Sequence, residues 1–192
     1  RSLILTPTRE LASQIMQNID DYSAGLGLKT KVVYGGVGRQ DQVDSIALGL
    51  DILVATPGRL LDLIKTGDIN FKALEVFVLD EADTMLDMGF FKDVQSIISK
   101  LPKNRQTLLF SATMPPKIEI LAEAILTDPT KIQITAKTVT IDLINQSVYH
   151  LEKSNKVPLL FNILKESDYK KVLIFCKTKP GADIIVNALE EA

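Results

Sequence analysis

Residues 76–83 have the sequence Val-Phe-Val-Leu-Asp-Glu-Ala-Asp, in which four apolar residues run directly into an acidic cluster. The apolar residues do not alternate with polar ones, which is typical of a strand buried on both faces of a parallel sheet. Ligands of such sheets bind at the carboxyl ends of the strands. The stretch therefore predicts a buried parallel strand that presents Asp80 and Glu81 at the ligand-binding edge.

Other apolar runs resemble this one, and longer segments with a stripe of apolar residues separate them. Residues 9–23, for example, repeat apolar side chains at spacings of three and four, as along one face of a helix. This alternation predicts an α/β fold with a doubly wound parallel sheet. The predicted strands are residues 3–6, 31–34, 51–55, 76–79, 107–110, 131–134, 146–151 and 172–176, and the predicted helices are residues 9–23, 40–48, 58–65, 91–100, 116–126, 155–166 and 181–191.

The chain changes character near residue 135. Residues 135–144 are rich in threonine and carry no helical stripe. Only two predicted strand–helix pairs follow, fewer than the about 4–6 strands of a common sheet. We therefore expect a first domain over residues 1–135, a linker over residues 136–144, and the truncated start of a second domain over residues 145–192.

The composition is that of a globular protein: of 192 residues, 46% are hydrophobic and 24% are charged, and the formal net charge is −2. These values exclude a disordered chain and a histone-like basic protein, but they allow a local phosphate-binding surface. The single cysteine, Cys176, excludes an internal disulfide and a cysteine-rich zinc site. No apolar run approaches the roughly 20 residues of a membrane span, so we expect a cytoplasmic protein. Because Arg1 stands in place of a starting methionine, we expect a fragment of a longer protein.

Asp80 and Glu81 are the first candidates for chemistry. Two adjacent carboxylates at a strand end repel each other and lose hydration, which indicates a nearby cation. Asp80 suits Mg²⁺ bound through water, because Mg²⁺ keeps much of its hydration shell. Glu81 can orient or deprotonate a water molecule. The alternative is a purely structural acidic helix start, which the helix dipole favours.

Two further turns combine threonine, proline and arginine where a strand is followed by a helix: residues 6–9, Thr-Pro-Thr-Arg, and residues 56–59, Thr-Pro-Gly-Arg. Free N–H groups of a helix start, hydroxyls and a guanidinium together favour phosphate, so the two turns predict two contacts to one polyanion. Alternatively, Thr-Pro is simply a common way to begin a helix. Gly35-Gly36 predicts either a close backbone approach or a plain turn.

Ser111-Ala112-Thr113 places two hydroxyls after the predicted strand 107–110. They can bridge Asp83 and a bound nucleotide, or serve only as ordinary turn residues. The single histidine, His150, has no nucleophile-elbow glycine pattern beside it, so we expect a structural role in a strand rather than a Ser–His–Asp triad. Cys176 lies in an apolar run and predicts an inert core thiol.

Taken together and in this order, these segments resemble the DEAD-box RNA helicases of superfamily two, and the resemblance covers essentially the whole chain. Residues 80–83, Asp-Glu-Ala-Asp, match motif II, the Walker B element that names the family. Residues 143–156 are most similar to the bacterial RhlE-like branch. The other matches are motif Ia at residues 7–12, the double-glycine motif at residues 35–36, motif Ib at residues 56–59, motif III at residues 111–113 and motif IV at residues 173–175 with Thr178.

The resemblance implies two RecA-like domains that use ATP and Mg²⁺ to separate RNA duplexes locally, without sequence preference. It implies that Glu81 and Asp80 serve ATP hydrolysis, with Mg²⁺ held by Asp80 through water. It implies that the ATP and RNA sites are coupled by Asp83, Ser111, Ala112 and Thr113. The residues that it implies for RNA binding are Pro7, Thr8, Arg9, Gly35, Gly36, Thr56, Pro57, Gly58, Arg59 and Thr178.

Four family elements have no counterpart in this sequence: the Q motif, the Walker A loop and motifs V and VI. We therefore expect an ATP-dependent RNA helicase in the full-length parent and no activity from the 192 residues alone. The alternatives are a non-catalytic RNA clamp or scaffold, an enzyme that moves along DNA, and a doubly wound domain without a nucleotide site. The sequences Asp-Glu-Ala-Asp and Thr-Pro-Gly-Arg favour RNA over DNA by family likeness.

Overall fold

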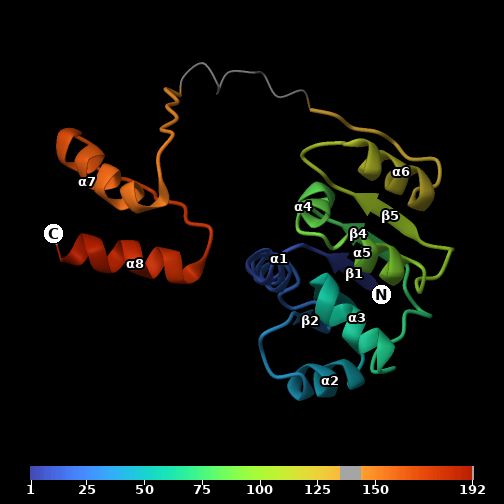
Figure 1. Cartoon of the computed structure of the whole chain (residues 1–192). Helices are drawn as coiled ribbons and strands as arrows, with labels where there is room; N and C mark the ends of the chain where they lie inside the picture. Colours follow the sequence, from blue (N-terminus) through green and yellow to red (C-terminus); the bar gives the residue numbers. More distant parts are fainter. Residues whose placement is uncertain (135–143, 192) are drawn as a thin grey trace. The chain divides into compact units, whose positions relative to one another are not determined.

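The computed structural model describes residues 1–134 and 144–191. The chain forms two compact units, Arg1–Ile132 and Gln133–Ala192 (Figure 1). Of the predicted linker, residues 136–144, all but Ile144 lie outside the described residues.

The first unit contains a five-stranded parallel sheet with the strand order β2-β3-β1-β4-β5. Each strand pairs in register with its neighbours, so all five strands end at one edge, as Leu5, Ala55 and Leu79 do. Five of the predicted strands are thereby confirmed to within one or two residues. The strands are β1 (Ser2–Leu5), β2 (Thr30–Val33), β3 (Ile52–Ala55), β4 (Val76–Leu79) and β5 (Gln106–Leu109).

Six helices connect or follow these strands. Five of them confirm predicted helices, whereas α4 was not predicted because its six residues are too few for a recognisable stripe. Thr8 caps the first helix, since its hydroxyl accepts a hydrogen bond from the backbone N–H of Leu11 at 3.2 Å. The helices are α1 (Arg9–Tyr22), α2 (Gln40–Ala47), α3 (Pro57–Lys65), α4 (Ala82–Asp87), α5 (Phe91–Ile98) and α6 (Pro116–Ile125).

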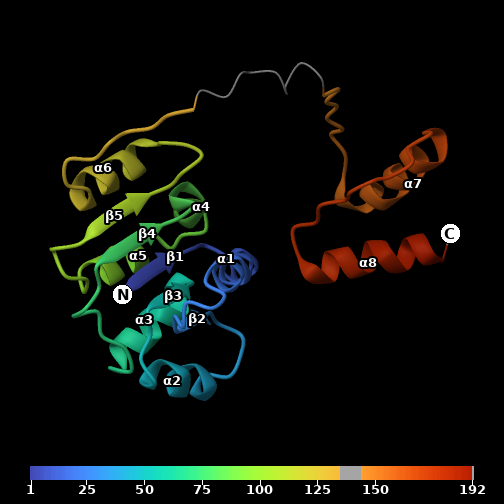
Figure 2. The ribbon, with the colours of Figure 1, turned by 180° about the vertical axis from the view of Figure 1, so that it is seen from behind.

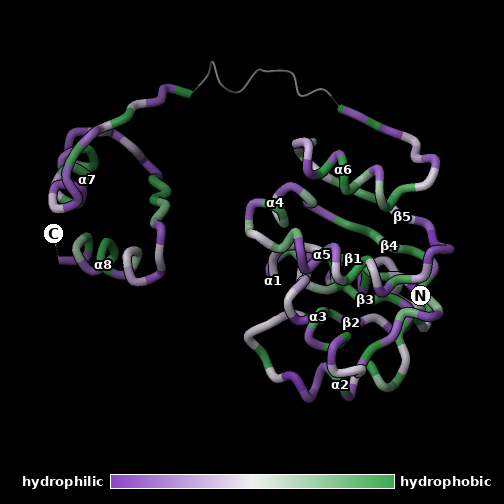
Figure 3. Tube along the Cα trace, turned by 45° about the vertical axis from the view of Figure 1, so that its right-hand side comes forward, coloured by the Kyte–Doolittle hydropathy of each residue, from purple (hydrophilic) through white to green (hydrophobic). Residues whose placement is uncertain are grey.

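The two faces of the sheet are covered unequally (Figures 1 and 2). Helix α1 packs on one face through Ala12 and Met16, against Val54. The other helices contribute to the larger core on the opposite face, which includes Phe77. Consequently β1 and β4 alternate between buried and half-buried residues, and the prediction that these strands are buried on both faces is wrong. Figure 3 shows that hydrophobic residues are frequent along the strands of the first unit, whereas its helices contain both hydrophilic and hydrophobic residues.

The second unit contains a short 3-10 helix, η1 (Lys153–Asn155), and the helices α7 (Lys156–Glu166) and α8 (Lys179–Glu190). The two α-helices confirm the predicted helices 155–166 and 181–191. The three strands predicted at residues 131–134, 146–151 and 172–176 are wrong, because these residues have no strand structure. A strand needs a neighbour for its backbone N–H and C=O groups, and no strand lies beside these segments within the described residues.

Candidate functional site

The predicted site residues of the first unit gather at the carboxyl edge of its sheet, because parallel strands all end there. They form two clusters. The residues after β4 and β5 are here called the acidic cluster, which consists of Asp80, Glu81, Asp83, Ser111 and Thr113. The residues after β1, β2 and β3 are here called the arginine cluster, which consists of Thr8, Arg9, Gly35, Gly36, Thr56 and Arg59.

Asp83 is the most strongly hydrogen-bonded carboxylate of the acidic cluster. Its Oδ2 accepts hydrogen bonds from the backbone N–H of Thr113 at 2.8 Å and from the Thr113 hydroxyl at 2.7 Å. The backbone N–H of Asp83 donates to the Ser111 hydroxyl oxygen at 3.1 Å, and that hydroxyl donates to the Thr113 carbonyl at 2.7 Å. These bonds join the start of α4 to the segment after β5.

The ionisation of Asp83 follows from these contacts. Desolvation by burial raises the pKa of this carboxyl, but hydrogen bonds from Thr113, Ser111 and Thr84 outweigh it and lower the pKa to about 2. Asp83 is therefore a charged acceptor at neutral pH. The predicted contact between the hydroxyls and Asp83 is present, whereas their coupling role stays a prediction.

Asp80 and Glu81 differ from Asp83 in their surroundings. Burial, opposed by a hydrogen bond from the backbone N–H of Glu81 and reinforced by the Glu81 charge, raises the pKa of Asp80. A bound cation would reverse this effect, which fits Asp80 as a carboxylate that holds Mg²⁺. The described residues contain no cluster of three or more metal-ligating side chains, so Mg²⁺ here would take its other ligands from water and nucleotide oxygens.

Glu81 has a left-handed backbone, with φ 50° and ψ 54°. Its neighbours explain this conformation. The Asp80 N–H donates to the carbonyl of Leu5 at the end of β1, and the Ala82 N–H donates to the carbonyl of Phe110 after β5. The chain must turn sharply between these two anchors, and a residue other than glycine is strained there. The Glu81 side chain is exposed, whereas that of Asp80 is partly buried.

In the arginine cluster, the guanidinium of Arg9 lies against the backbone of Gly36. The Arg9 guanidinium lies 5.7 Å from the centre of the Tyr34 ring and donates to the Gly35 carbonyl at 2.8 Å. Gly36 has φ +82°, and a Cβ atom at this position would lie 2.1 Å from Nη1 of Arg9. A larger residue would be strained by this φ and would displace the Arg9 guanidinium. The close approach at Gly36 is thus made by a side chain and not, as was predicted, by a backbone.

Thr56, Pro57 and Arg59 belong to the second turn for which we predict a phosphate contact, and that contact stays a prediction. Pro57 is the first residue of α3, as expected, but the Thr56 hydroxyl makes no capping hydrogen bond in this described segment. Nη2 of Arg59 donates to the Val37 carbonyl at 3.1 Å, while its Nη1 is buried without a partner among the described residues. Both arginines thus contact the loop after β2.

A cavity of about 510 Å³ lies between these residues. Glu10, Asp62, Met88 and Phe90 line it in addition to the predicted site residues. Glu10 falls within the motif Ia match at residues 7–12 but was assigned no role, and the other three residues were not predicted. No signal in the sequence indicates Asp62, Met88 or Phe90, because the contact of these residues with the cavity depends on tertiary structure. The cavity is lined by Pro7, Thr8, Arg9, Glu10, Gly35, Thr56, Gly58, Arg59, Asp62, Met88 and Phe90.

Three singled-out residues lie in the second unit. The Thr178 hydroxyl caps α8 by accepting from the Gly181 N–H at 3.2 Å, so its contact with RNA stays a prediction. His150 is exposed and outside any strand, which corrects its expected placement in a strand. Cys176 is half-buried rather than in a core, since the unit buries no residue of its helices.

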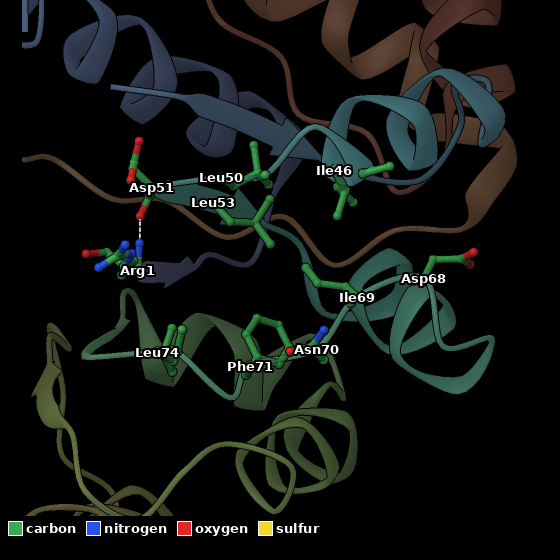
Figure 4. Close-up of a pocket in the computed structure, with 14 residues that line it drawn as sticks. Arg1, Ile46, Leu50, Asp51, Leu53, Asp68, Ile69, Asn70, Phe71 and Leu74 are labelled. Atoms are coloured by element: carbon green, nitrogen blue, oxygen red, sulfur yellow. Dashed lines mark hydrogen bonds between the residues drawn. The ribbon is translucent and has the colours of Figure 1, made fainter. Parts of the chain in front are cut away.

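A second cavity, of about 350 Å³, lies at the opposite edge of the sheet (Figure 4). Leu53, Phe71 and Leu74 form apolar walls, and Asp51 lies beside Arg1 at its rim. None of the predicted site residues lines this cavity. Among the helices of the described ranges, none is long and apolar enough to cross a membrane.

Comparison with known proteins places the chain among helicases. The family model for DEAD/DEAH box helicases matches residues 1–121. The DEAD-box ATP-dependent RNA helicase CshA of Streptococcus pneumoniae is 37% identical over 190 residues, and DEAD-box ATP-dependent RNA helicase 20 of Oryza sativa subsp. japonica is 42% identical over 189 residues. These alignments cover 99% and 97% of this chain, but only 36% and 38% of the relatives. The chain thus spans little more than a third of their length.

A solved structure agrees with these relatives. The crystal structure of a DEAD box protein from the hyperthermophile Methanococcus jannaschii is 38% identical, with a TM-score of 0.67. The match covers 100% of this chain and 51% of that chain. The five-stranded parallel sheet is therefore the RecA-like α/β fold that the motifs predicted.

Proposed function

This chain belongs to the DEAD/DEAH box helicase family, and on that basis we propose that the whole protein is an ATP-dependent RNA helicase. One observation of the structure supports this most. The acidic cluster and the arginine cluster lie at the same edge of one sheet, after the adjacent strands β4 and β1. A hydrolytic centre beside a polyanion-binding surface is what an RNA-stimulated ATPase requires.

The roles in the proposed reaction follow from the charges and contacts. Asp80 would hold Mg²⁺ through water, and the bound Mg²⁺ would neutralise charge on the phosphates of ATP. The exposed Glu81 carboxylate would accept a proton from the attacking water. Asp83 and Thr113 would transmit changes between the two clusters, because their hydrogen bonds join α4 to the segment after β5.

The arginine cluster would bind the RNA backbone. Arg9 and Arg59 place two guanidinium groups around one cavity, and the capped start of α1 adds free backbone N–H groups. Contacts of this kind position a strand without distinguishing its bases, which agrees with unwinding that has no sequence preference. The alternatives of an RNA clamp and of a DNA-dependent enzyme become outcomes of the test.

The test is Glu81→Gln in the whole protein, with Glu123→Gln on α6 as an exposed control. Loss of the carboxylate removes the proton acceptor, so RNA-stimulated ATP turnover should fall about 10²- to 10⁴-fold while ATP binding persists. The control should keep full turnover. The 192 residues alone serve as a blank without turnover, because their sequence contains no Gly-Lys-Thr or Gly-Lys-Ser loop.

Three results would contradict the proposal. Near-normal turnover by Glu81→Gln would show that Glu81 is not the proton acceptor. RNA binding without any ATP turnover by the unmodified whole protein would favour the clamp. Stimulation by DNA but not by RNA would favour the DNA-dependent enzyme.

A further inference from the structure

Residues 35–38, which connect β2 to α2 and contribute to the arginine cluster, are held almost entirely by side chains. No hydrogen bond between backbone groups involves these residues within the described part of the chain. Instead, the Gly35 carbonyl accepts from Arg9, and the Val37 carbonyl accepts from Arg59. A loop without a backbone ladder has the shape that its side-chain donors impose.

Gln42 on α2 supplies the two remaining contacts. Its Nε2 donates to the Tyr34 carbonyl at 3.3 Å and to the Gly38 carbonyl at 3.1 Å. These carbonyls flank residues 35–37, so one amide group holds both ends of the loop. The start of α2 is fixed independently, because Arg39 pairs with Asp62 of α3 and with Asp68.

The burial of Gln42 is unusual for a polar side chain. Only 6% of its surface is exposed, and its Oε1 is buried without a hydrogen-bond partner among the described residues. A buried acceptor without a partner lowers stability, and an apolar side chain of the same shape would avoid that loss. Core packing alone does not explain a buried amide at this position, whereas its two hydrogen bonds to the loop do.

We propose that Gln42 is a positioning residue for RNA binding, an inference that rests on the proposed function. By fixing residues 35–38, Gln42 keeps the Gly35 and Val37 carbonyls where Arg9 and Arg59 donate to them. Each guanidinium is then already oriented beside the cavity before RNA arrives. A loop released from Gln42 would leave both arginines to be ordered during binding, at the expense of affinity.

The test is Gln42→Met in the whole protein, since methionine keeps the length of the side chain but has no donor. Loss of two hydrogen bonds should raise the RNA concentration for half-maximal ATPase stimulation about 10-fold. The maximal stimulated rate should stay the same, because no residue of the acidic cluster is altered. The salt dependence of RNA binding should also stay the same, because the charges that contact phosphate remain.

The matched control is Gln40→Met. Gln40 lies on the same helix, is exposed, and donates only to Asp44 at 2.8 Å, so its replacement should change neither RNA binding nor stimulation. If Gln42→Met does not fold, Gln42→Leu tests the same point, because a leucine side chain also lacks a donor and adds no polar atom to this buried position.

The outcomes separate the two proposals. Unmodified whole protein without RNA-stimulated ATP turnover would contradict the proposed function. With turnover present, a folded Gln42→Met or Gln42→Leu variant that needs no more RNA than the Gln40→Met control would contradict only the role of Gln42. A variant whose maximal rate falls at unchanged RNA affinity would also overturn it.

Discussion

At the residue scale, the backbone of Glu81 combines a cost in stability with the position of the proposed proton acceptor. A residue other than glycine in the left-handed region costs of order 1 kcal/mol. Among the described residues other than glycine, Asp128 also has a positive φ, at 46°, and it lies outside both clusters. Comparing substitutions at Glu81 and Asp128 therefore separates the effect of backbone strain on stability from the effect of the Glu81 side chain on ATP turnover.

Glu81→Gly and Asp128→Gly should each relieve left-handed strain, and each should raise the free energy of unfolding by up to about 1 kcal/mol. In the whole protein, Glu81→Gly should abolish ATP turnover, whereas Asp128→Gly should keep it. Denaturant unfolding and an ATPase assay check both expectations. A destabilised Glu81→Gly variant would mean that the Glu81 side chain, rather than strain, dominates the local energetics.

At the scale of elements, the predicted strands are present only where a neighbouring strand pairs with them. The predicted strand Val76–Leu79 does form, because β1 and β5 pair with it and Phe77 packs in the core. Residues 172–176, Val-Leu-Ile-Phe-Cys, are also an uninterrupted apolar run, yet they form no strand and Leu173 is 77% exposed. Composition reports the preference of a segment, whereas pairing decides its structure.

The candidate site was predictable to a similar degree. Strand ends identified Arg9, Glu81 and Thr113, because parallel strands finish at one edge. Gln42 and Met88 were not recognisable, since one lies inside a helix and the other beyond a short one. Their proximity to the arginine cluster arises from tertiary structure alone.

The arginine cluster as an element gives a prediction about salt. Arg9→Ala and Arg59→Ala should each weaken RNA binding uniformly across sequences and reduce the slope of log K against log salt by about one. Lys103→Ala is the control, because Lys103 is exposed and precedes β5 at the opposite edge of the sheet. Titrations of each variant with RNA at several salt concentrations measure both the affinity and the slope. A changed base preference with an unchanged slope would mean that the arginine contacts bases.

At the scale of the whole molecule, the two units differ in how much they bury. The first unit has a core built around Phe77, Leu3 and Leu5, all fully buried. The helices α7 and α8 bury no residue, and Phe175 between them is 87% exposed. Helices of about 12 residues are marginal in water without packing partners.

Hydrogen exchange of the 192-residue chain should therefore divide at the boundary of the units. Amides of β1 and β4 should exchange only through global unfolding, while amides of α7 and α8 should exchange orders of magnitude faster. Mass spectrometry of peptides from each unit measures both rates. Equal protection of β1 and α8 would contradict this expectation and would indicate that the second unit is stabilised by packing.

The anchoring of Glu81 has a mechanical consequence. Its flanking peptides are hydrogen-bonded to the ends of β1 and β5, the strands on either side of β4. Any change in the twist of these three strands must therefore rotate the backbone at Glu81 and re-aim its carboxylate. The orientation of the Glu81 side chain therefore depends on the geometry of the sheet. If Glu81 is the proton acceptor, as proposed, substitutions deep within these strands should alter ATP turnover of the whole protein without changing any residue of the acidic cluster or the arginine cluster.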